Sequence, residues 1–99
     1  MSDSLTVIAR ITSKLGKEEQ LREALEALIE PTLKEEGCIN YELHQGVEEP
    51  SVFVFYENWA SKELHAKHIN SPHLNEFKEK MDDLLAAPIQ IDLVKRISY

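Results

Sequence analysis

Residues 55–74, "FYENWASKELHAKHINSPHL", bring together side chains that can exchange protons, stack on flat rings or bind metal ions. A neutral imidazole accepts a proton near neutral pH. An indole stacks on an aromatic ring and donates one N–H, whereas a buried carboxylate is costly unless it is paired. The residues concerned are Glu57, Trp59, His65, His68 and His73. The segment is therefore either the lining of a reactive pocket or the end of a strand followed by an ordinary polar helix.

Each of these side chains has a structural interpretation beside the functional one. Trp59 stacks on a flat substrate or anchors a small core. His68 accepts a phenolic proton or caps the end of a short helix. Glu57 shares a strand face with Trp59 and is a general base or, as the sequence favours, the partner of Arg10 or Arg96 in a buried ion pair.

A metal site is not favoured by the spacing of the histidines. His65 and His68 are three residues apart and can share a helix face. No Cys, Asp or Glu stands at a convincing third position, and Pro72 interrupts the helix before His73. We therefore expect no metal. Cys38 has no evident activating partner, so we expect it to be a small buried apolar residue.

Four segments have the alternation of β-strands. They are residues 5–12, 38–45, 52–59 and 89–97. In the second, Ile39, Tyr41 and Leu43 are expected to share a face. The second and third are joined by "GVEEPS", which predicts a hairpin.

The helices lie between the strands. Residues 17–36 repeat leucines at helical spacing; Pro31 should kink or divide this helix, and Gly37 should end it. Ser61 is a plausible N-cap of a short second helix. Ser71 and Pro72 should begin another helix that Pro88 ends. One domain spanning residues 1–99 follows, with a four-stranded antiparallel sheet covered on one face by helices.

The third strand, residues 52–59, is apolar on both faces, which indicates that both are buried. A monomer would leave an apolar patch exposed. We therefore expect a homodimer whose sheets pack face to face, with Phe53, Phe55 or the residues opposite them inside.

Composition limits the other partners. The chain has 18 acidic and 11 basic residues, a net charge of −7, and no Lys/Arg cluster, which argues against nucleic acid and anionic membranes. It has one cysteine, no signal-like N-terminal segment and no apolar stretch of the length that spans a bilayer. We expect a cytoplasmic protein.

Three short motifs in this order resemble the antibiotic biosynthesis monooxygenase family. They are Glu36-Gly37-Cys38 with Tyr41; Glu57 with Trp59; and His68 with Ser71, Pro72 and His73. The resemblance implies an α+β ferredoxin-like fold, usually paired through its sheets into a dimeric α/β barrel. It also implies an oxygenase that uses no metal, flavin or haem, in which deprotonation of a quinol or phenol lets the anion reduce dioxygen directly.

Two features separate the chain from well-understood members. Phe55 stands where the aromatic-polyketide oxygenases carry an Asn, while Asn58 points to the other side of the strand. The first strand, residues 5–12, lacks the Asn of the haem-degrading relatives. The chain is closer to small stand-alone members proposed to be quinol monooxygenases.

The expected reaction is a cofactor-independent monooxygenation of a quinol or hydroxyaromatic. The candidate catalytic residues are His68, Trp59 and Glu57, and the candidate substrate-binding residues are Arg10, Phe55, Tyr41 and His44. Two alternatives remain. One is an isomerase of a small polar or phosphorylated metabolite, with Arg10, Lys95 and Arg96 as its cations; the other is a non-catalytic dimeric domain that binds a hydrophobic ligand.

Overall fold

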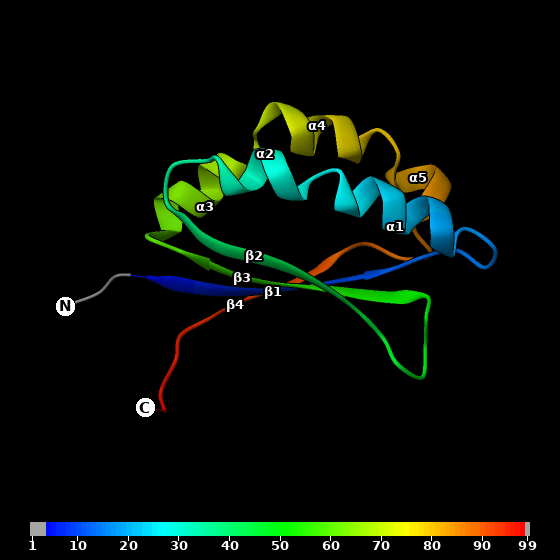
Figure 1. The fold of residues 1–99 in the computed structure, drawn as a ribbon, viewed down its shortest axis with the longest axis horizontal. Helices are drawn as coiled ribbons and strands as arrows, with labels where there is room; N and C mark the ends of the chain where they lie inside the picture. The colour runs from blue at the N-terminus through cyan, green and yellow to red at the C-terminus, as the bar shows by residue number, and fades with distance from the viewer. Residues whose placement is uncertain (1–3, 99) are drawn as a thin grey trace.

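The predicted strands form one antiparallel sheet in a computed structural model that describes residues 4–98. The strands are β1 (Leu5–Thr12), β2 (Cys38–Gln45), β3 (Val52–Trp59) and β4 (Gln90–Val94). Their order across the sheet is β2-β3-β1-β4, with β1 antiparallel to both of its neighbours and β2 antiparallel to β3. The predicted ferredoxin-like α+β fold is confirmed (Figure 1).

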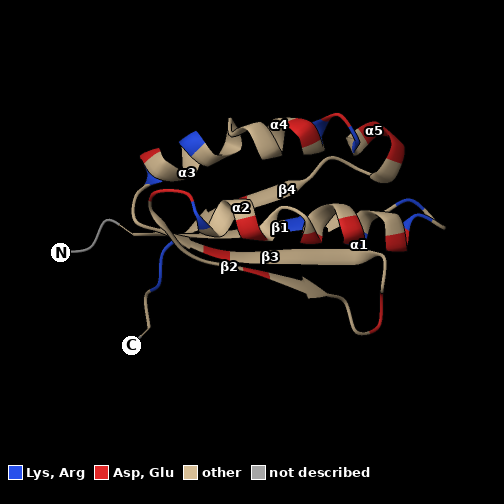
Figure 2. Ribbon diagram, turned by 45° about the horizontal axis from the view of Figure 1, so that its top comes forward, with Lys and Arg blue, Asp and Glu red and all other residues tan. Residues whose placement is uncertain are grey.

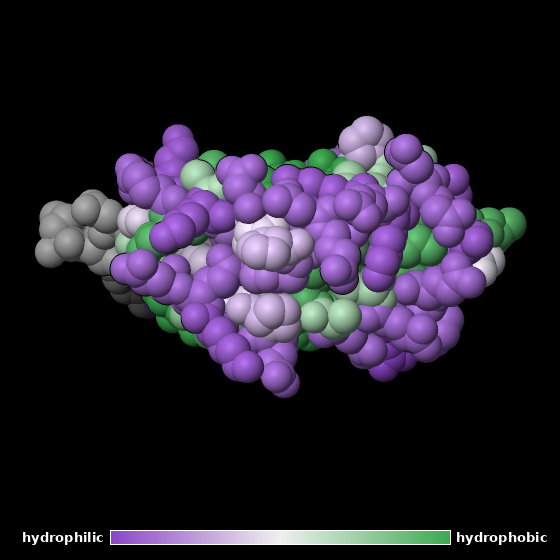
Figure 3. All heavy atoms as spheres, turned by 90° about the horizontal axis from the view of Figure 1, so that it is seen from above, coloured by the Kyte–Doolittle hydropathy of each residue, from purple (hydrophilic) through white to green (hydrophobic). Residues whose placement is uncertain are grey.

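Helices cover one face of this sheet and leave the other open (Figure 1). They are α1 (Glu18–Glu26), α2 (Ile29–Leu33), α3 (Lys62–Ile69), α4 (Pro72–Lys78) and α5 (Met81–Leu84). Seen from the helical side, the surface is largely hydrophilic (Figure 3). Acidic positions occur on the ribbons of α1, α4 and α5 (Figure 2). Within residues 4–98 no helix has the length and hydropathy that a membrane span requires.

Both long helices that the sequence predicts are divided. Pro31 has no N–H to donate to the carbonyl of Ala27. As predicted, the helix is interrupted just before Pro31, between α1 and α2. The break between α4 and α5 is a difference from the prediction. After α5 the backbone pairs with the end of β1, since Lys14 N–H donates to the carbonyl of Leu84 and Ala86 N–H donates to that of Thr12, both at 2.8 Å. This pairing ends the helix before Pro88, and β4 is shorter than the predicted 89–97.

The two faces of β3 have different environments. Phe53, Phe55 and Trp59 are buried beneath the helices, at 1%, 2% and 0% exposure. Val54 and Tyr56 point to the open face of the sheet, where Val54 is half-buried and Tyr56 is 40% exposed. The monomer therefore already buries the phenylalanine face, and only the residues opposite Phe53 and Phe55 are free to meet a second sheet.

A β-bulge changes one expected face of β2. Cys38 pairs with Trp59 and Asn40 with Asn58, so Ile39 is an extra residue between them. The expectation that Ile39 shares a face with Tyr41 is wrong: Ile39 is 59% exposed, whereas Tyr41 is 5% exposed. Strict alternation fails here because the bulge adds one residue to one strand only.

Candidate functional site

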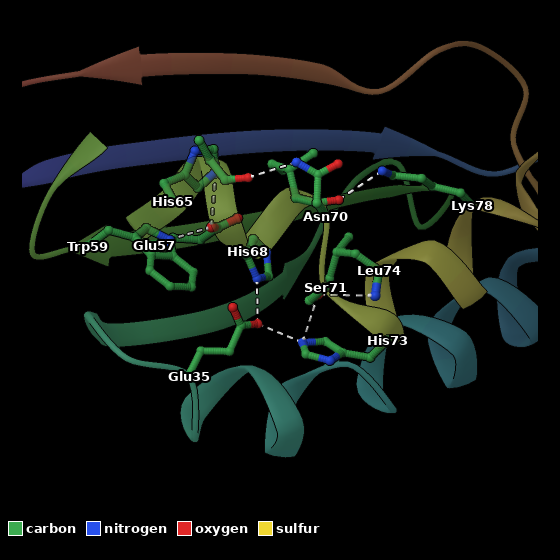
Figure 4. Close-up of polar contacts among 12 residues, drawn as sticks. Glu35, Glu57, Trp59, His65, His68, Asn70, Ser71, His73, Leu74 and Lys78 are labelled. Atoms are coloured by element: carbon green, nitrogen blue, oxygen red, sulfur yellow. Dashed lines mark hydrogen bonds and ion pairs between the residues drawn. The ribbon is translucent and has the colours of Figure 1, made fainter. Parts of the chain in front are cut away.

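Glu57 and Trp59 lie on the helix-facing side of β3, two residues apart (Figure 4). The indole Nε1–H of Trp59 donates to Oε1 of Glu57 at 2.8 Å, and His65 Nε2 lies 3.9 Å from the same oxygen. Burial raises the pKa of Glu57 from 4.5 to about 7, although the Trp59 hydrogen bond opposes this rise. The carboxyl group is thus poised to gain or lose a proton near neutral pH.

His68 comes from α3 and is almost fully buried, at 2% exposure. Its Nδ1 lies 2.7 Å from Oε2 of Glu35. Because an ionised carboxylate only accepts hydrogen bonds, Nδ1–H must donate, which leaves the Nε2 lone pair as an acceptor. Burial lowers the pKa of His68 below 6.5 despite the opposing effect of Glu35, so the ring is neutral at pH 7.

Glu35 is the residue that sequence reasoning missed. It follows α2, and its Oε2 also lies 2.6 Å from Nε2 of His73, at the start of α4 (Figure 4). These contacts join residues 33 and 38 positions apart. The only local signal was the adjacent Glu36-Gly37-Cys38 motif. The argument that no acid stands near the histidines is therefore corrected by the fold.

A small cavity lies between the sheet and the helices beside these groups. Its volume is about 40 Å³. It is lined by Val7, Ala9, Ile11, Leu25, Leu28, Tyr41, Phe55, Glu57, His65, His68, Ile69, Leu74, Phe77, Ile89 and Ile91. Ile91, on β4, is 45% exposed, so this wall reaches the surface. The interior is apolar except for Glu57, the two histidines and the Tyr41 hydroxyl.

Tyr41 and Phe55 form the floor of this region. Their rings stack with centroids 4.2 Å apart, and the His68 ring meets Tyr41 edge-on at 5.4 Å. Burial raises the pKa of Tyr41 well above 10, so its phenol stays protonated and is not a base. Burial likewise raises the pKa of Cys38 to about 11, which makes the thiol a poor nucleophile.

The structure thus gathers most of the predicted site residues and separates two of them. Glu57, Trp59, His68, Tyr41 and Phe55 lie together, and the 4.7 Å between the Trp59 and His68 ring centroids places the indole directly against the imidazole.

Arg10 and His44 lie on the opposite face of the sheet. Arg10 pairs in register with Val54, whereas Glu57 pairs with Val7. His44 is exposed and also lies across from Val54. The expected ion pair between Glu57 and Arg10 is wrong, because the two side chains point to opposite sides of the sheet.

The family model described as antibiotic biosynthesis monooxygenase matches residues 4–80, which include three of the four strands and all of α3 and α4. Glu35, Glu57 and His68 fall within this match, whereas the cavity residues Ile89 and Ile91 lie beyond it.

Two relatives are similar over nearly the whole chain. A Synechocystis protein, sll1783, is 34% identical over 93 residues, or 94% of this chain, which spans 63% of that relative's length. A Mycobacterium tuberculosis protein named "Putative monooxygenase Rv0793" is 29% identical over 94 residues, covering 95% of this chain and 92% of the relative.

Solved structures agree with the fold. PA3566 from Pseudomonas aeruginosa superimposes with a TM-score of 0.92 at 35% identity and covers 99% of this chain and 98% of its own. The Rv0793 structure gives a TM-score of 0.89 at 27% identity, with 97% of each chain covered.

Proposed function

Because the chain belongs to the antibiotic biosynthesis monooxygenase family, we propose that it is a cofactor-independent monooxygenase of a quinol or related hydroxyaromatic. One observation carries the proposal. A neutral, buried His68 lines an apolar cavity, and Glu35 fixes its tautomer so that Nε2 is the proton acceptor. An acceptor of this kind suits the removal of a phenolic proton.

The reaction needs only the substrate and dioxygen. His68 Nε2 takes a proton from a quinol hydroxyl, and the resulting anion supplies electrons to O₂. A quinol and O₂ then yield a hydroxyquinone and water: one oxygen atom forms the new C–O bond, and the other leaves as water with two hydrogens from the quinol. Glu35, hydrogen-bonded to Nδ1, stabilises the imidazolium that forms.

Glu57 and Trp59 have supporting roles in this proposal. A carboxyl group with a pKa of about 7 can return a proton to a reduced oxygen species as readily as it can accept one. The indole of Trp59 holds that carboxyl by its 2.8 Å hydrogen bond and packs against His68. Trp59 therefore acts as a positioning residue.

The size of the cavity sets a condition on the proposal. At about 40 Å³ it has room for a few water molecules, whereas pockets for small molecules usually exceed about 300 Å³. A ring enters only if side chains that line the cavity move apart. The apolar lining, rather than the volume, favours the second candidate function, a non-catalytic dimeric domain that binds a hydrophobic ligand. It does not favour the isomerase, since no Lys or Arg lines the cavity.

The open face of the sheet supports a homodimer within the same proposal. Ile8 and Val54 are only half-buried there, and Tyr56 and Val94 are 40% and 41% exposed. We expect two such faces to pack together. Light scattering at micromolar concentration should give twice the chain mass, and Tyr56→Glu should shift it toward one chain mass. A wild-type mass of one chain would rule out the pairing.

Oxygen uptake by chelator-treated protein tests the catalytic proposal. A panel of quinols should support uptake, and His68→Ala should slow it at least about 100-fold, the usual contribution of a positioned base. Trp59→Phe removes the indole N–H and should slow it less. Glu23→Gln, an exposed position on α1, is the matched control. Uptake that is unchanged in both site variants, or absent with every quinol, contradicts the proposal.

A further inference from the structure

The cluster of Glu35, His68 and His73 contains more than the proposed reaction uses. The reaction needs Glu35 to hold His68, yet the same carboxylate oxygen also binds His73 (Figure 4). We propose that these three residues form a binding site for a divalent transition metal ion, with Zn²⁺ as its natural fit. Two imidazoles and one carboxylate are the donor set of many zinc sites and of non-haem iron sites.

The geometry of the cluster already approaches that of a coordination sphere. Glu35 Oε2, His68 Nδ1 and His73 Nε2 all lie within 4.8 Å of one another. The two O–N separations are 2.7 and 2.6 Å. Ligand atoms about 2.1 Å from an ion are about 3.0–3.4 Å apart at right to tetrahedral angles, so each separation needs to widen by about half an ångström.

The electrostatics of the cluster also favour a cation. Two imidazole nitrogens converge on one carboxylate oxygen. When an ion binds between them, the proton of each neutral ring moves to its other nitrogen, so that two nitrogen lone pairs and that oxygen become the ligands. The neighbouring surface groove has a volume of about 310 Å³. It is lined by Glu35, Glu36, Leu64, Lys67, Asn70, Ser71, Pro72 and His73. Its charged residues are two glutamates and one lysine, which gives a net attraction for a cation.

Access differs among the three ligands in a way that suits binding from solvent. The side chains of Glu35 and His73 are 17% and 20% exposed and line the groove, whereas that of His68 is 2% exposed and lines the inner cavity. An ion therefore enters from the groove and meets His68 last. Water in the groove completes its coordination, as in zinc sites with an open position.

Metal binding would prevent His68 from acting as the proposed base. An ion on Nδ1 of His68 takes that nitrogen's lone pair, so the proton of the neutral ring must sit on Nε2, where an acceptor is needed. This consequence rests on the proposed function, but the metal site does not. A bound ion and an active base are thus alternative states of one imidazole, and Zn²⁺ should inhibit oxygen uptake.

Titration calorimetry of the full chain, stripped with a chelator, tests the site directly. Zn²⁺ should bind with one ion per chain, and Glu35→Gln and His73→Ala should each weaken binding at least about 100-fold. Co²⁺ should give the visible absorption of a low-coordinate site. His44→Ala, which removes an exposed histidine on the opposite face of the sheet, should leave the affinity unchanged. Circular dichroism confirms that each variant is folded, and His73→Gln serves as a second variant at the exposed end.

The outcomes separate this inference from the proposed function. Binding that is lost in both ligand variants supports the site even if no quinol is ever oxidised. Equal affinity in wild type, Glu35→Gln and His73→Ala overturns it, as does the absence of Zn²⁺ binding. Quinol-dependent uptake that Zn²⁺ inhibits in wild type but not in His73→Ala would additionally join the site to the reaction.

Discussion

Replacing Glu57 by Gln should change how stability depends on pH. The pKa of Glu57 is about 7 in the folded protein against an ordinary 4.5, because the group is buried at 3% exposure. Between these values the folded state keeps a proton that the unfolded state has released. The stabilisation from the protonated carboxyl is therefore complete below pH 4.5 and is lost as the pH rises to about 7.

The magnitude follows from the two pKa values. At about 1.4 kcal/mol per pH unit, the full interval corresponds to about 3 kcal/mol of unfolding free energy. From pH 5 to pH 8 wild type should lose about 2.5 kcal/mol from this group. Glu57→Gln keeps an oxygen for the Trp59 indole but cannot ionise, so it should not show this loss.

Urea unfolding at several pH values between 5 and 8 measures the effect. The quantity of interest is the difference in unfolding free energy between Glu57→Gln and wild type, because the subtraction removes titrations common to both. His68 is such a case: burial lowers its pKa, and its contribution falls as the pH drops below about 6.5. The difference should grow by about 2.5 kcal/mol toward pH 8. A pH-independent difference, or an equal trend in Glu23→Gln, would refute the reasoning.

Three further predictions concern two glycines, a helix cap and the cysteine. Gly37→Ala should lower the free energy of unfolding in urea more than Gly16→Ala does. Both glycines have φ near +85°, where an alanine costs about 1–2 kcal/mol. Only at Gly37 would the new Cβ also lie 2.9 Å from the Cβ of Leu64. Equal costs would remove that contact from the argument. Ser61→Ala should lower stability by about 1 kcal/mol, since it deletes the α3 cap; no change would contradict the cap. At pH 8, iodoacetamide should alkylate Cys38 at least about 100-fold more slowly than in urea-unfolded protein, and equal rates would contradict its raised pKa of about 11.

The fold was largely predictable because its signals are local. The alternation of apolar and polar residues predicted the strands. The predicted N-caps Ser61 and Ser71 accept hydrogen bonds from the N–H groups of Leu64 and Leu74. The extra residue Ile39 was not predictable, because a bulge is a property of two paired strands rather than of one.

The site was predictable only in part, for a related reason. Glu57, Trp59 and His68 stand in one short segment, so their proximity could be inferred from sequence. Glu35 reaches His68 and His73 only in the folded chain, and no spacing rule links residues so far apart in sequence. The register between β1 and β3 pairs Glu57 with Val7 and so puts Glu57 and Arg10 on opposite faces, and one strand's sequence does not fix the register with its neighbour.

The two borders of the sheet differ in a way that affects handling of the protein. β2 lies at one border and carries Glu42, His44 and Gln45, all exposed and polar. β4 lies at the other, where Leu93 and Val94 are 45% and 41% exposed. Its outer backbone groups have no neighbouring strand in the sheet order, so they offer a template for pairing with another chain. Variants designed to separate a dimer should consequently tend to precipitate through β4, and a charged residue there would improve their solubility.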